Sequence, residues 1–344
     1  MKDLSNPPAL SIVEHPDASV GLVALVVTHN RKAQLRVTLE SLLAEKVAVI
    51  VVVDNASTDG TGDLLRAVAD PRLYVVTLAR NMGGAGGFEA GLRAVRACFD
   101  PAWCVVMDDD ARPYPGTFAR FQSQSAQLEH AGFEAIAAGV YYPDGRICEM
   151  NRPSRNPFWH FRDFMRTALG QGRSGFHLRD SDYAATGPLP IDAASFVGLF
   201  LSRKGLARAG YPDGALFLYA DDVMYTLRLT KRGGRIGFLP SLRFEHDCTT
   251  HPPDGGGIHR PLWKVYYNYR NALRAYRMVA GPVLFWPVLM LVFVKWRGRA
   301  RHGGADRHAY LALLNLAVKD ALTGRISRDI VEVRALARSL TRNG

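Results

Sequence analysis

Four short apolar segments alternate with amphipathic stretches in the first 110 residues, and no other feature of the sequence restricts the fold as strongly. Each segment is continuous and rich in β-branched residues, which is typical of a strand buried on both faces. Between them, apolar side chains recur at helical spacing, as Leu35, Leu39 and Leu42 do. Right-handed β-α-β connections then predict an α/β fold with a mainly parallel sheet. The predicted strands are residues 22–29, 47–55, 73–80 and 102–109.

The rest of the chain is less regular and ends in a helical region. A segment rich in Gly and Pro at 250–261 is typical of a loop or a lid, and helical patterns follow it. Before that loop we expect a helix near 115–130, a strand near 135–141 and a helix over 221–234. The sequence therefore predicts three parts: an N-terminal segment (1–20), an α/β domain (21–257) and a helical, basic C-terminal region (258–344).

Positive charge is concentrated in the C-terminal region. Lys and Arg outnumber Asp and Glu by 43 to 32 in the 344 residues, and by 16 to 4 within residues 258–344. A basic segment can meet nucleic acid, anionic lipid or an acidic substrate. The first residues lack the pattern of a secretory signal. The cysteines show no C-x-x-C spacing, so we expect a reduced cytoplasmic protein without a zinc site or a disulfide framework. These cysteines are Cys98, Cys104, Cys148 and Cys248.

Three adjacent carboxylates, Asp108, Asp109 and Asp110, close the fourth predicted strand. In a parallel sheet, ligands bind beyond the carboxyl ends of the strands. Adjacent charges next to a buried strand are costly unless a cation neutralises them. Oxygen ligands suit Mg²⁺ or Mn²⁺, which often also hold substrate phosphates. The alternative interpretation is a solvated acidic turn.

Two further features point to a nucleotide at the same edge of the sheet. Asp54 ends the second predicted strand, where a carboxylate can accept hydrogen bonds from ribose or a base, or can form an Asx turn. The segment ARNMGGAGGFEAG (79–91) allows a diphosphate to approach the start of a helix, although tight strand-to-helix turns also contain glycine. The residues of this segment that we expect at the ligand are Arg80, Asn81, Gly83 and Gly84.

A second acidic pair, Asp221 and Asp222, opens the helix predicted over 221–234, and His246 follows a probable strand. One carboxylate of such a pair could deprotonate an incoming hydroxyl group. A neutral imidazole is a good additional ligand for Mn²⁺. The alternatives are acidic residues favoured by the helix dipole and a structural histidine.

Taken in order, these segments resemble the inverting family-2 glycosyltransferases of the GT-A fold, whose sheet is Rossmann-like. The resemblance is strongest to bacterial galactofuranosyltransferases of the galactan-initiating type. It covers residues 22–275. The segments that carry it are VVTHNR, VVVDNASTDGT, ARNMGGAGGF, MDDDA and FLYADDVMYTLR, with the later histidine.

The resemblance implies which residues meet the donor. Thr28 and Asp54 would bind the uracil and ribose of a UDP-sugar, and Asp109 would contact the sugar. Arg270, in the pattern YYNYRN, would contact a diphosphate of the donor or of a lipid acceptor.

The resemblance also implies the chemistry. Asp108, Asp110 and His246 would hold Mn²⁺ or Mg²⁺. Asp222, or failing that Asp221, would take the proton of the acceptor hydroxyl during direct displacement at the anomeric carbon, with inversion.

The implied donor is UDP-galactofuranose, and the implied acceptor is a glycan or a polyprenyl-linked glycan of the cell envelope. Related rhamnosyltransferases, which use dTDP-rhamnose, usually show Glu-Asp at the base and a simpler Asp pair at the metal; this chain has Asp-Asp and a triple Asp. A nucleotide-sugar pyrophosphorylase and a non-catalytic nucleotide-binding module, its basic tail holding nucleic acid, are the alternatives from other classes.

An apolar run in the C-terminal region predicts contact with a membrane. Residues 278–294 are uncharged and lie between Arg277 and Lys295, but Pro282 and Pro287 interrupt them. A spanning helix needs about 20 apolar residues, so we expect shallow insertion at the cytoplasmic face of the inner membrane. The alternative is a buried helical hairpin. We expect no nucleic-acid partner, and a homo-oligomer is possible.

Overall fold

The computed structural model describes residues 21–248, 257–326 and 328–342. The expected N-terminal segment (1–20) and residues 250–256 of the expected loop lie outside the described residues. The strands are β1 (Leu22–Thr28), β2 (Val49–Asp54), β3 (Leu73–Thr77), β4 (Trp103–Asp108), β5 (Ala111–Pro113), β6 (Ala135–Tyr141), β7 (Leu189–Ile191), β8 (Leu199–Ser202) and β9 (Ile236–His246). The helices are α1 (Lys32–Ala44), α2 (Thr61–Ala67), α3 (Gly83–Cys98), α4 (Thr117–His130), α5 (Phe161–Arg166), α6 (Arg203–Ala209), α7 (Asp221–Lys231), α8 (Trp263–Arg299), α9 (Arg307–Thr323) and α10 (Ile330–Arg342).

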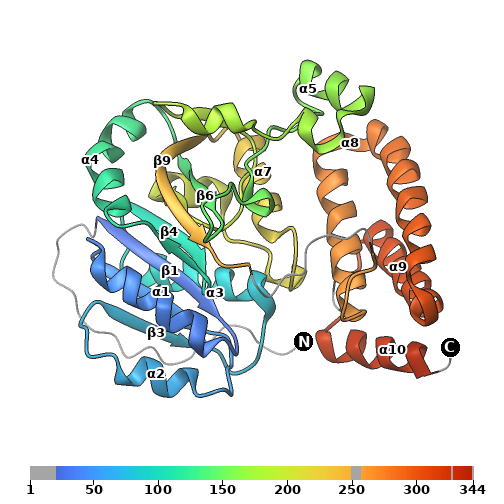
Figure 1. Ribbon diagram of the computed structural model, residues 1–344, viewed down its shortest axis with the longest axis horizontal. Coiled ribbons are helices and arrows are strands. Elements are labelled where there is room, and N and C mark those ends of the chain that lie inside the picture. Colours follow the sequence, from blue (N-terminus) through green and yellow to red (C-terminus); the bar gives the residue numbers. More distant parts are fainter. Residues whose placement is uncertain (1–20, 249–256, 327, 343–344) are drawn as a thin grey trace.

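The described strands form one sheet in the order β3-β2-β1-β4-β8-β6-β9-β5, with β7 paired to β9 (Figure 1). The predicted parallel part is confirmed, because β3, β2, β1 and β4 are parallel neighbours. Alternate side chains of β1 pack with α1 on one face of the sheet and with α3 on the other. The register pairs Thr28 with Asp54 and Val27 with Asp108. The carboxyl ends of these strands therefore meet at one edge.

Glycines let helix α3 lie directly against the sheet. A Cβ atom on Gly87 would stand 2.4 Å from Val27 Cγ1, and one on Gly91 would stand 2.5 Å from Leu25 Cδ1. Atoms in a packed core do not approach so closely, so a larger side chain would push α3 away from β1. Part of the glycine-rich pattern at 79–91 therefore serves helix packing and not ligand binding.

Strand β9 carries the C-terminal part of the sheet to the acidic turn. It runs parallel to β6 and antiparallel to the short strand β5, and this pairing aligns Ala111 with His246. Because Ala111 follows Asp110 in the chain, His246 lies beside the carboxylates. The sheet is thus mixed, with β8 antiparallel to both β4 and β6.

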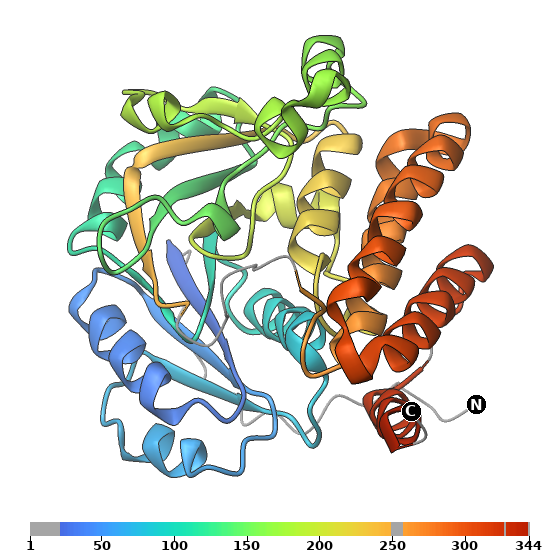
Figure 2. The same cartoon turned by 45° about the vertical axis from the view of Figure 1, so that its right-hand side comes forward.

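Helices α8, α9 and α10 form a hydrophobic cluster beside the sheet (Figures 1 and 2). Helix α8 is interrupted at Gly281, whose φ of 69° is not helical. The chain reverses there, because Tyr269 packs on Trp296 at a ring distance of 4.5 Å and Arg277 lies over Phe285. Helix α8 is therefore two antiparallel halves, which we call the α8 hairpin.

The outer face of the α8 hairpin is apolar and exposed. By length and composition, α8 is the one helix among the described residues that could cross a membrane. Each half is about 27 Å long, however, which is shorter than a hydrocarbon core of about 30 Å. A helical hairpin does form, as the alternative interpretation expected. Its outer face is not buried, however, because several large apolar side chains are exposed there. The side chains that are more than half exposed are Val283, Trp286, Met290, Leu291 and Val294.

Candidate active site

The acidic turn after β4 and the last residue of β9 form a cluster that could hold a cation. One side-chain ligand atom each from Asp108, Asp110 and His246 lies within 4.8 Å of the other two. Asp110 and His246 are buried, and Asp108 is half-buried. Two carboxylates and an imidazole match the oxygen and nitrogen ligands that Mn²⁺ and Mg²⁺ accept, so the residues present fit such an ion.

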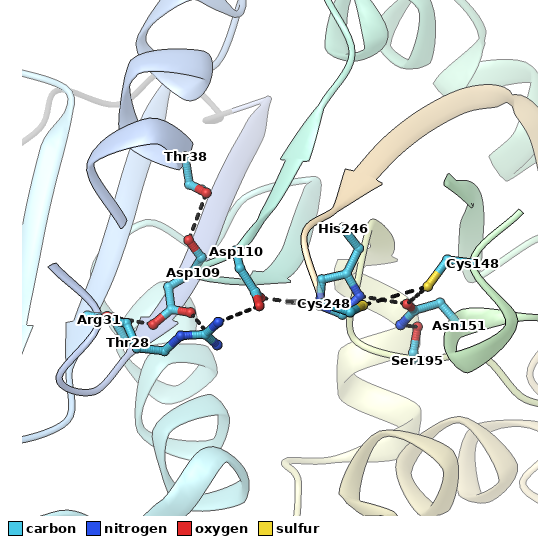
Figure 3. A network of polar contacts seen from close by, with 10 residues as sticks. All are labelled: Thr28, Arg31, Thr38, Asp109, Asp110, Cys148, Asn151, Ser195, His246 and Cys248. Atoms are coloured by element: carbon cyan, nitrogen blue, oxygen red, sulfur yellow. Dashed lines mark hydrogen bonds and ion pairs between the residues drawn. The ribbon is translucent and has the colours of Figure 1, made fainter. Parts of the chain in front are cut away.

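Asp110 is the best-paired carboxylate of the cluster (Figure 3). His246 Nε2 lies 3.2 Å from Asp110 Oδ1, and Arg31 Nη2 donates to Asp110 Oδ2 at 2.6 Å. Burial disfavours the carboxylate ion, but these two hydrogen bonds and the charges behind them outweigh burial and lower the pKa of Asp110. Arg31 also pairs with Asp109 at 3.1 Å. The sequence analysis did not single out Arg31, which only appeared within the motif VVTHNR.

The pKa of Asp108 is shifted in the opposite direction to that of Asp110. Burial raises the pKa of Asp108 to about 7, and the negative charge of Asp110 adds to this effect. The ionised form of Asp108 is therefore disfavoured in a site that already contains Asp109 and Asp110. A divalent cation would remove that penalty, because it offsets the mutual repulsion of the carboxylates.

His246 is oriented by a residue that the sequence analysis missed. Asn151 Nδ2 donates to Ser195 Oγ at 2.8 Å, so its Oδ1 must be the atom that accepts from His246 Nδ1, at 2.7 Å. This contact keeps the proton on Nδ1 and turns Nε2 toward Asp110. Burial opposes a charged imidazole, but the hydrogen bond with Asp110 outweighs it and raises the pKa of His246 to about 10. No sequence pattern indicated Asn151, which lies in an irregular segment.

The side chains of Thr28 and Asp109 face each other. Thr28 Oγ1 donates to Asp109 Oδ2 at 2.7 Å, and both residues are at most 3% exposed. Burial raises the pKa of Asp109 to about 6, although Arg31 and Thr28 favour its ionised form. The contacts of Thr28 with uracil and of Asp109 with the sugar stay predictions; in this structure the two side chains bond to each other.

The residues around the glycine-rich turn hold the turn itself. Asp54 Oδ1 accepts from the Ser57 N–H at 2.9 Å, which is the Asx-type turn named as an alternative. Asn81 Oδ1 accepts from the Gly83 N–H at 2.7 Å, so this amide is already bonded. Gly83 has a φ of +71°, and a Cβ there would stand 2.0 Å from a backbone oxygen. The predicted contact of the Gly83 N–H with diphosphate is therefore wrong, because this N–H already donates to Asn81. The turn is a tight strand-to-helix connection.

Arg80 and Gly84 are the predicted ligand-binding residues of this turn that have free space around them. Arg80 is exposed, and an added Cβ on Gly84 would meet nothing within 4 Å. Asn55 connects β2 to the turn, because its Nδ2 donates to the Gly83 carbonyl at 2.9 Å.

Asp221 and Asp222 begin helix α7 on the same side as the acidic turn. The charge of Asp222 contributes to the raised pKa of Asp108, and the charge of Asp108 contributes to that of Asp221. Burial is the largest cause in both members of the pair, raising the pKa of Asp221 to about 8 and that of Asp222 to about 6. Burial and the mutual repulsion of the two carboxylates therefore leave the pair less than fully ionised near neutral pH.

The backbone before this acidic pair is strained. Phe217, Tyr219 and Ala220 have φ values of 66°, 71° and 61°, which are uncommon for residues other than glycine. Strain of this kind costs of order 1–3 kcal/mol per residue and persists only where the surroundings enforce it. It concentrates at functional sites.

Arg270 and Asn271 of helix α8 enforce the strained segment. Asn271 Nδ2 donates to the carbonyls of Leu218 and Tyr219 at 2.8 and 3.0 Å. Arg270 is fully buried and its Nη2 donates to the carbonyl of Leu216 at 2.9 Å. The predicted contact of Arg270 with a diphosphate is therefore wrong: its guanidinium is enclosed and holds backbone carbonyls instead.

Removing the Arg270 guanidinium should destabilise the protein. We expect Arg270→Leu to lower the free energy of unfolding by about 3 kcal/mol, because buried carbonyls lose their donor. Urea unfolding followed by circular dichroism measures this change. Arg297→Leu, on the exposed side of α8, is the control and should change stability by less than about 0.5 kcal/mol. Equal effects of the two substitutions would contradict the role given to Arg270.

The family model of glycosyl transferase family 2 matches residues 23–182. The galactofuranosyltransferase GlfT1 of Mycobacterium tuberculosis is 31% identical over 262 residues, which cover 72% of this chain and 79% of that protein. Among solved structures, S. aureus TarS 1–349 in complex with UDP-GlcNAc superposes with a TM-score of 0.51 at 12% identity, covering 94% of this chain and 92% of that one.

A second solved structure has a similar sheet. GalNAc-T7 with UDP, GalNAc and Mn²⁺ superposes with a TM-score of 0.52 at 14% identity, covering 76% of this chain and 48% of that one. At such low identity, both superpositions show that the fold is shared, and they give no information about the substrate.

Proposed function

The chain belongs to glycosyl transferase family 2, and on this premise we propose that it is an inverting transferase that moves galactofuranose from UDP-galactofuranose to a cell-envelope glycan. The observation that carries the proposal is the meeting of two acidic groups at one edge of the sheet. Asp108 and Asp110 lie with His246, and the Asp221–Asp222 pair is near enough for charge effects between it and Asp108 to raise the pKa values of Asp108 and Asp221. One group could bind a cation and the other could take a proton, which are the two requirements of the reaction.

The carboxylates of Asp108 and Asp110 and the Nε2 atom of His246 would hold Mn²⁺ or Mg²⁺. Such an ion supplies positive charge that stabilises the departing diphosphate. The support is the ligand set itself, together with the charge of Asp110, which adds to the effect of burial in raising the pKa of Asp108. Arg31, paired with Asp109 and Asp110, holds both carboxylates in place.

We assign Asp222 as the general base. It would accept the proton of the acceptor hydroxyl while the oxygen attacks the anomeric carbon from the side opposite the diphosphate, which inverts the configuration. The resemblance of the segment FLYADDVMYTLR to the family supports this choice over Asp221. We place the uridine next to Thr28 and Asp54, at the ends of β1 and β2, and the diphosphate near Arg80 and Gly84.

The donor sugar is proposed from sequence similarity. A galactofuranosyltransferase is 31% identical over most of its length, whereas dTDP-rhamnose is the alternative donor that the motifs allow. Incubation with UDP-galactofuranose, UDP-galactopyranose and dTDP-rhamnose, following nucleotide release, separates these cases. We expect release only from UDP-galactofuranose, and faster release from dTDP-rhamnose would reverse the assignment.

Asn151 should act on metal affinity through His246. We expect Asn151→Ala to weaken Mn²⁺ binding by about 10- to 100-fold, the usual range when the partner of a metal-bound histidine is removed. The affinity is measured from the Mn²⁺ concentration that half-saturates turnover. Asn156→Ala is the control, because Asn156 is also a buried asparagine but lies outside this network. An unchanged Mn²⁺ requirement in Asn151→Ala would show that Asn151 does not orient the imidazole.

The α8 hairpin supports a peripheral position at the cytoplasmic face of the inner membrane. Its exposed face presents Trp286, Met290 and Leu291, which are 59%, 66% and 74% exposed. Lys295 and Arg297 follow on the same helix and could meet anionic headgroups. Docking there would bring a polyprenyl-linked glycan acceptor to the site.

Charge on this face should prevent docking. We expect the double substitution Trp286→Glu and Leu291→Glu to reduce co-sedimentation with anionic liposomes at least about tenfold, because two apolar anchors become anionic. Val37→Glu, an exposed apolar position on α1, is the control and should sediment like the wild type. Equal sedimentation of both variants, or no binding of the wild type at low salt, would contradict membrane docking through this face.

A further inference from the structure

Two cysteines that lie 100 residues apart in the chain meet behind His246. Cys148 Sγ and Cys248 Sγ are 3.9 Å apart. One ligand atom from each cysteine and one from His246 lie within 4.8 Å of one another. Cys148 is fully buried, and Cys248 is half-buried, which leaves a route from solvent. The other two cysteines of the chain, Cys98 and Cys104, belong to different surroundings.

The spacing of these atoms suits a soft metal ion. Two sulfur ligands on tetrahedral Zn²⁺, each at about 2.3 Å, lie about 3.8 Å apart. The observed separation of 3.9 Å between the two Sγ atoms is close to this sulfur–sulfur distance. Asn151 Oδ1 is also at hand, because it lies 3.0 Å from Cys148 Sγ and 2.7 Å from His246 Nδ1. Two sulfurs, one nitrogen and one amide oxygen make a four-ligand set (Figure 3).

We propose that Cys148, Cys248 and the Nδ1 atom of His246 form a second cation site, which takes a thiophilic divalent ion such as Zn²⁺ or Cd²⁺. Binding releases the two thiol protons and the proton on His246 Nδ1 to solvent, and the metal then bonds two thiolates and one nitrogen of a neutral imidazole. The cysteine spacing predicted no zinc site, because a contact between such distant segments has no local pattern.

The second site shares His246 with the carboxylate site. Because of this, the two sites cannot hold a metal ion at the same time. A neutral imidazole has one nitrogen with a free lone pair and one with a proton. An ion bound at Nδ1 leaves the proton on Nε2, where it faces Asp110. An ion bound at Nε2 leaves the proton on Nδ1, where it faces Asn151. A thiophilic ion should therefore weaken Mn²⁺ binding at the carboxylates, and Mn²⁺ should weaken the thiophilic ion equally.

Cadmium titration of the reduced full-length protein tests the site without any assay of transfer. Cd²⁺–thiolate bonds absorb in the ultraviolet, and we expect the absorption to saturate at one Cd²⁺ per chain. Cys248→Ser and Cys148→Ser should each lower the absorption at saturation by about half, because one of two Cd–S bonds is lost. Cys98→Ser, a half-buried cysteine elsewhere, is the matched control and should keep the full signal. No absorption in the wild type, or equal absorption in Cys248→Ser, would overturn the proposal.

Competition for His246 is tested by the free Mn²⁺ signal in electron paramagnetic resonance. Addition of one equivalent of Zn²⁺ should release more Mn²⁺ from the wild type than from Cys248→Ser, in which Zn²⁺ competes only at the carboxylates. Mn²⁺ that stays bound when the Cd²⁺ signal is present would show two independent sites and overturn the shared imidazole. This part rests on the proposed carboxylate site. If the wild type binds no Mn²⁺ before Zn²⁺ is added, the proposed function fails, and the cadmium titration still decides the cysteine site.

Discussion

Replacing Asp222 with asparagine should lower kcat for sugar transfer by about 10²- to 10⁴-fold, the usual contribution of a general base. The amide keeps the shape of the side chain but cannot take the proton of the acceptor hydroxyl. UDP affinity should stay within about twofold, because Asp222 is not among the proposed nucleotide or metal ligands. Single-turnover kinetics with UDP-galactofuranose, together with calorimetric titration of UDP, separate the two effects.

Asp221→Asn is the matched control for this substitution. Both residues lie in the first turn of α7, so a general disturbance of the helix would affect the two variants alike. Burial and the charge of Asp222 raise the pKa of Asp221 and disfavour its charged form, so a neutral amide at Asp221 should retain most of the activity. A large loss in Asp221→Asn with little loss in Asp222→Asn would exchange the two roles. Weaker UDP binding in Asp222→Asn would indicate that Asp222 is a ligand of the nucleotide or the metal and not the base.

The pH dependence follows from the same assignment. A general base must be ionised to accept a proton, and burial raises the pKa of Asp222 to about 6. We therefore expect kcat to be nearly constant above that pH and to fall about tenfold per unit below it. This acidic limb should disappear from the residual activity of Asp222→Asn. If the limb persists, another group controls it.

Loss of the metal ligand His246 should have an equally large effect. We expect His246→Ala to raise the Mn²⁺ concentration needed for half-maximal turnover by more than about 100-fold, beyond the range seen when only a partner of a ligand is removed. Treatment of the wild type with EDTA should stop turnover, and added Mn²⁺ should restore it. His308→Ala, on the exposed side of α9, is the control. Full turnover of the wild type in EDTA would contradict metal dependence.

Local sequence patterns were enough to predict the parallel half of the fold. The strands β1 to β4 are continuous apolar runs, and their register brings Thr28, Asp54 and Asp108 to one edge as expected. The pairing of β5 with β9 could not be predicted, because it joins residues more than 130 positions apart. That pairing places His246 in the site. The chemistry of imidazole made His246 a candidate ligand, and the family resemblance grouped it with Asp108 and Asp110.

The candidate site was predicted less completely, for two physical reasons. Arg31 and Asn151 act through hydrogen bonds to Asp110 and His246, and such partners follow no spacing rule. The diphosphate contact of Arg270 came from the family resemblance of the pattern YYNYRN, which says nothing of how deeply the side chain is buried. In the folded chain its guanidinium lies between Tyr266 and Tyr267 and donates to buried carbonyls. Burial of a long cation of this kind depends on tertiary packing.

The position of the bound ion is the most direct test of the active-site assignment. Crystals grown with UDP and MnCl₂ should show one anomalous scattering peak bounded by Asp108, Asp110 and His246, with the diphosphate of UDP on its open side. A Mn²⁺ peak at any other place, or UDP bound at the sheet edge with no metal beside these three residues, would contradict the account.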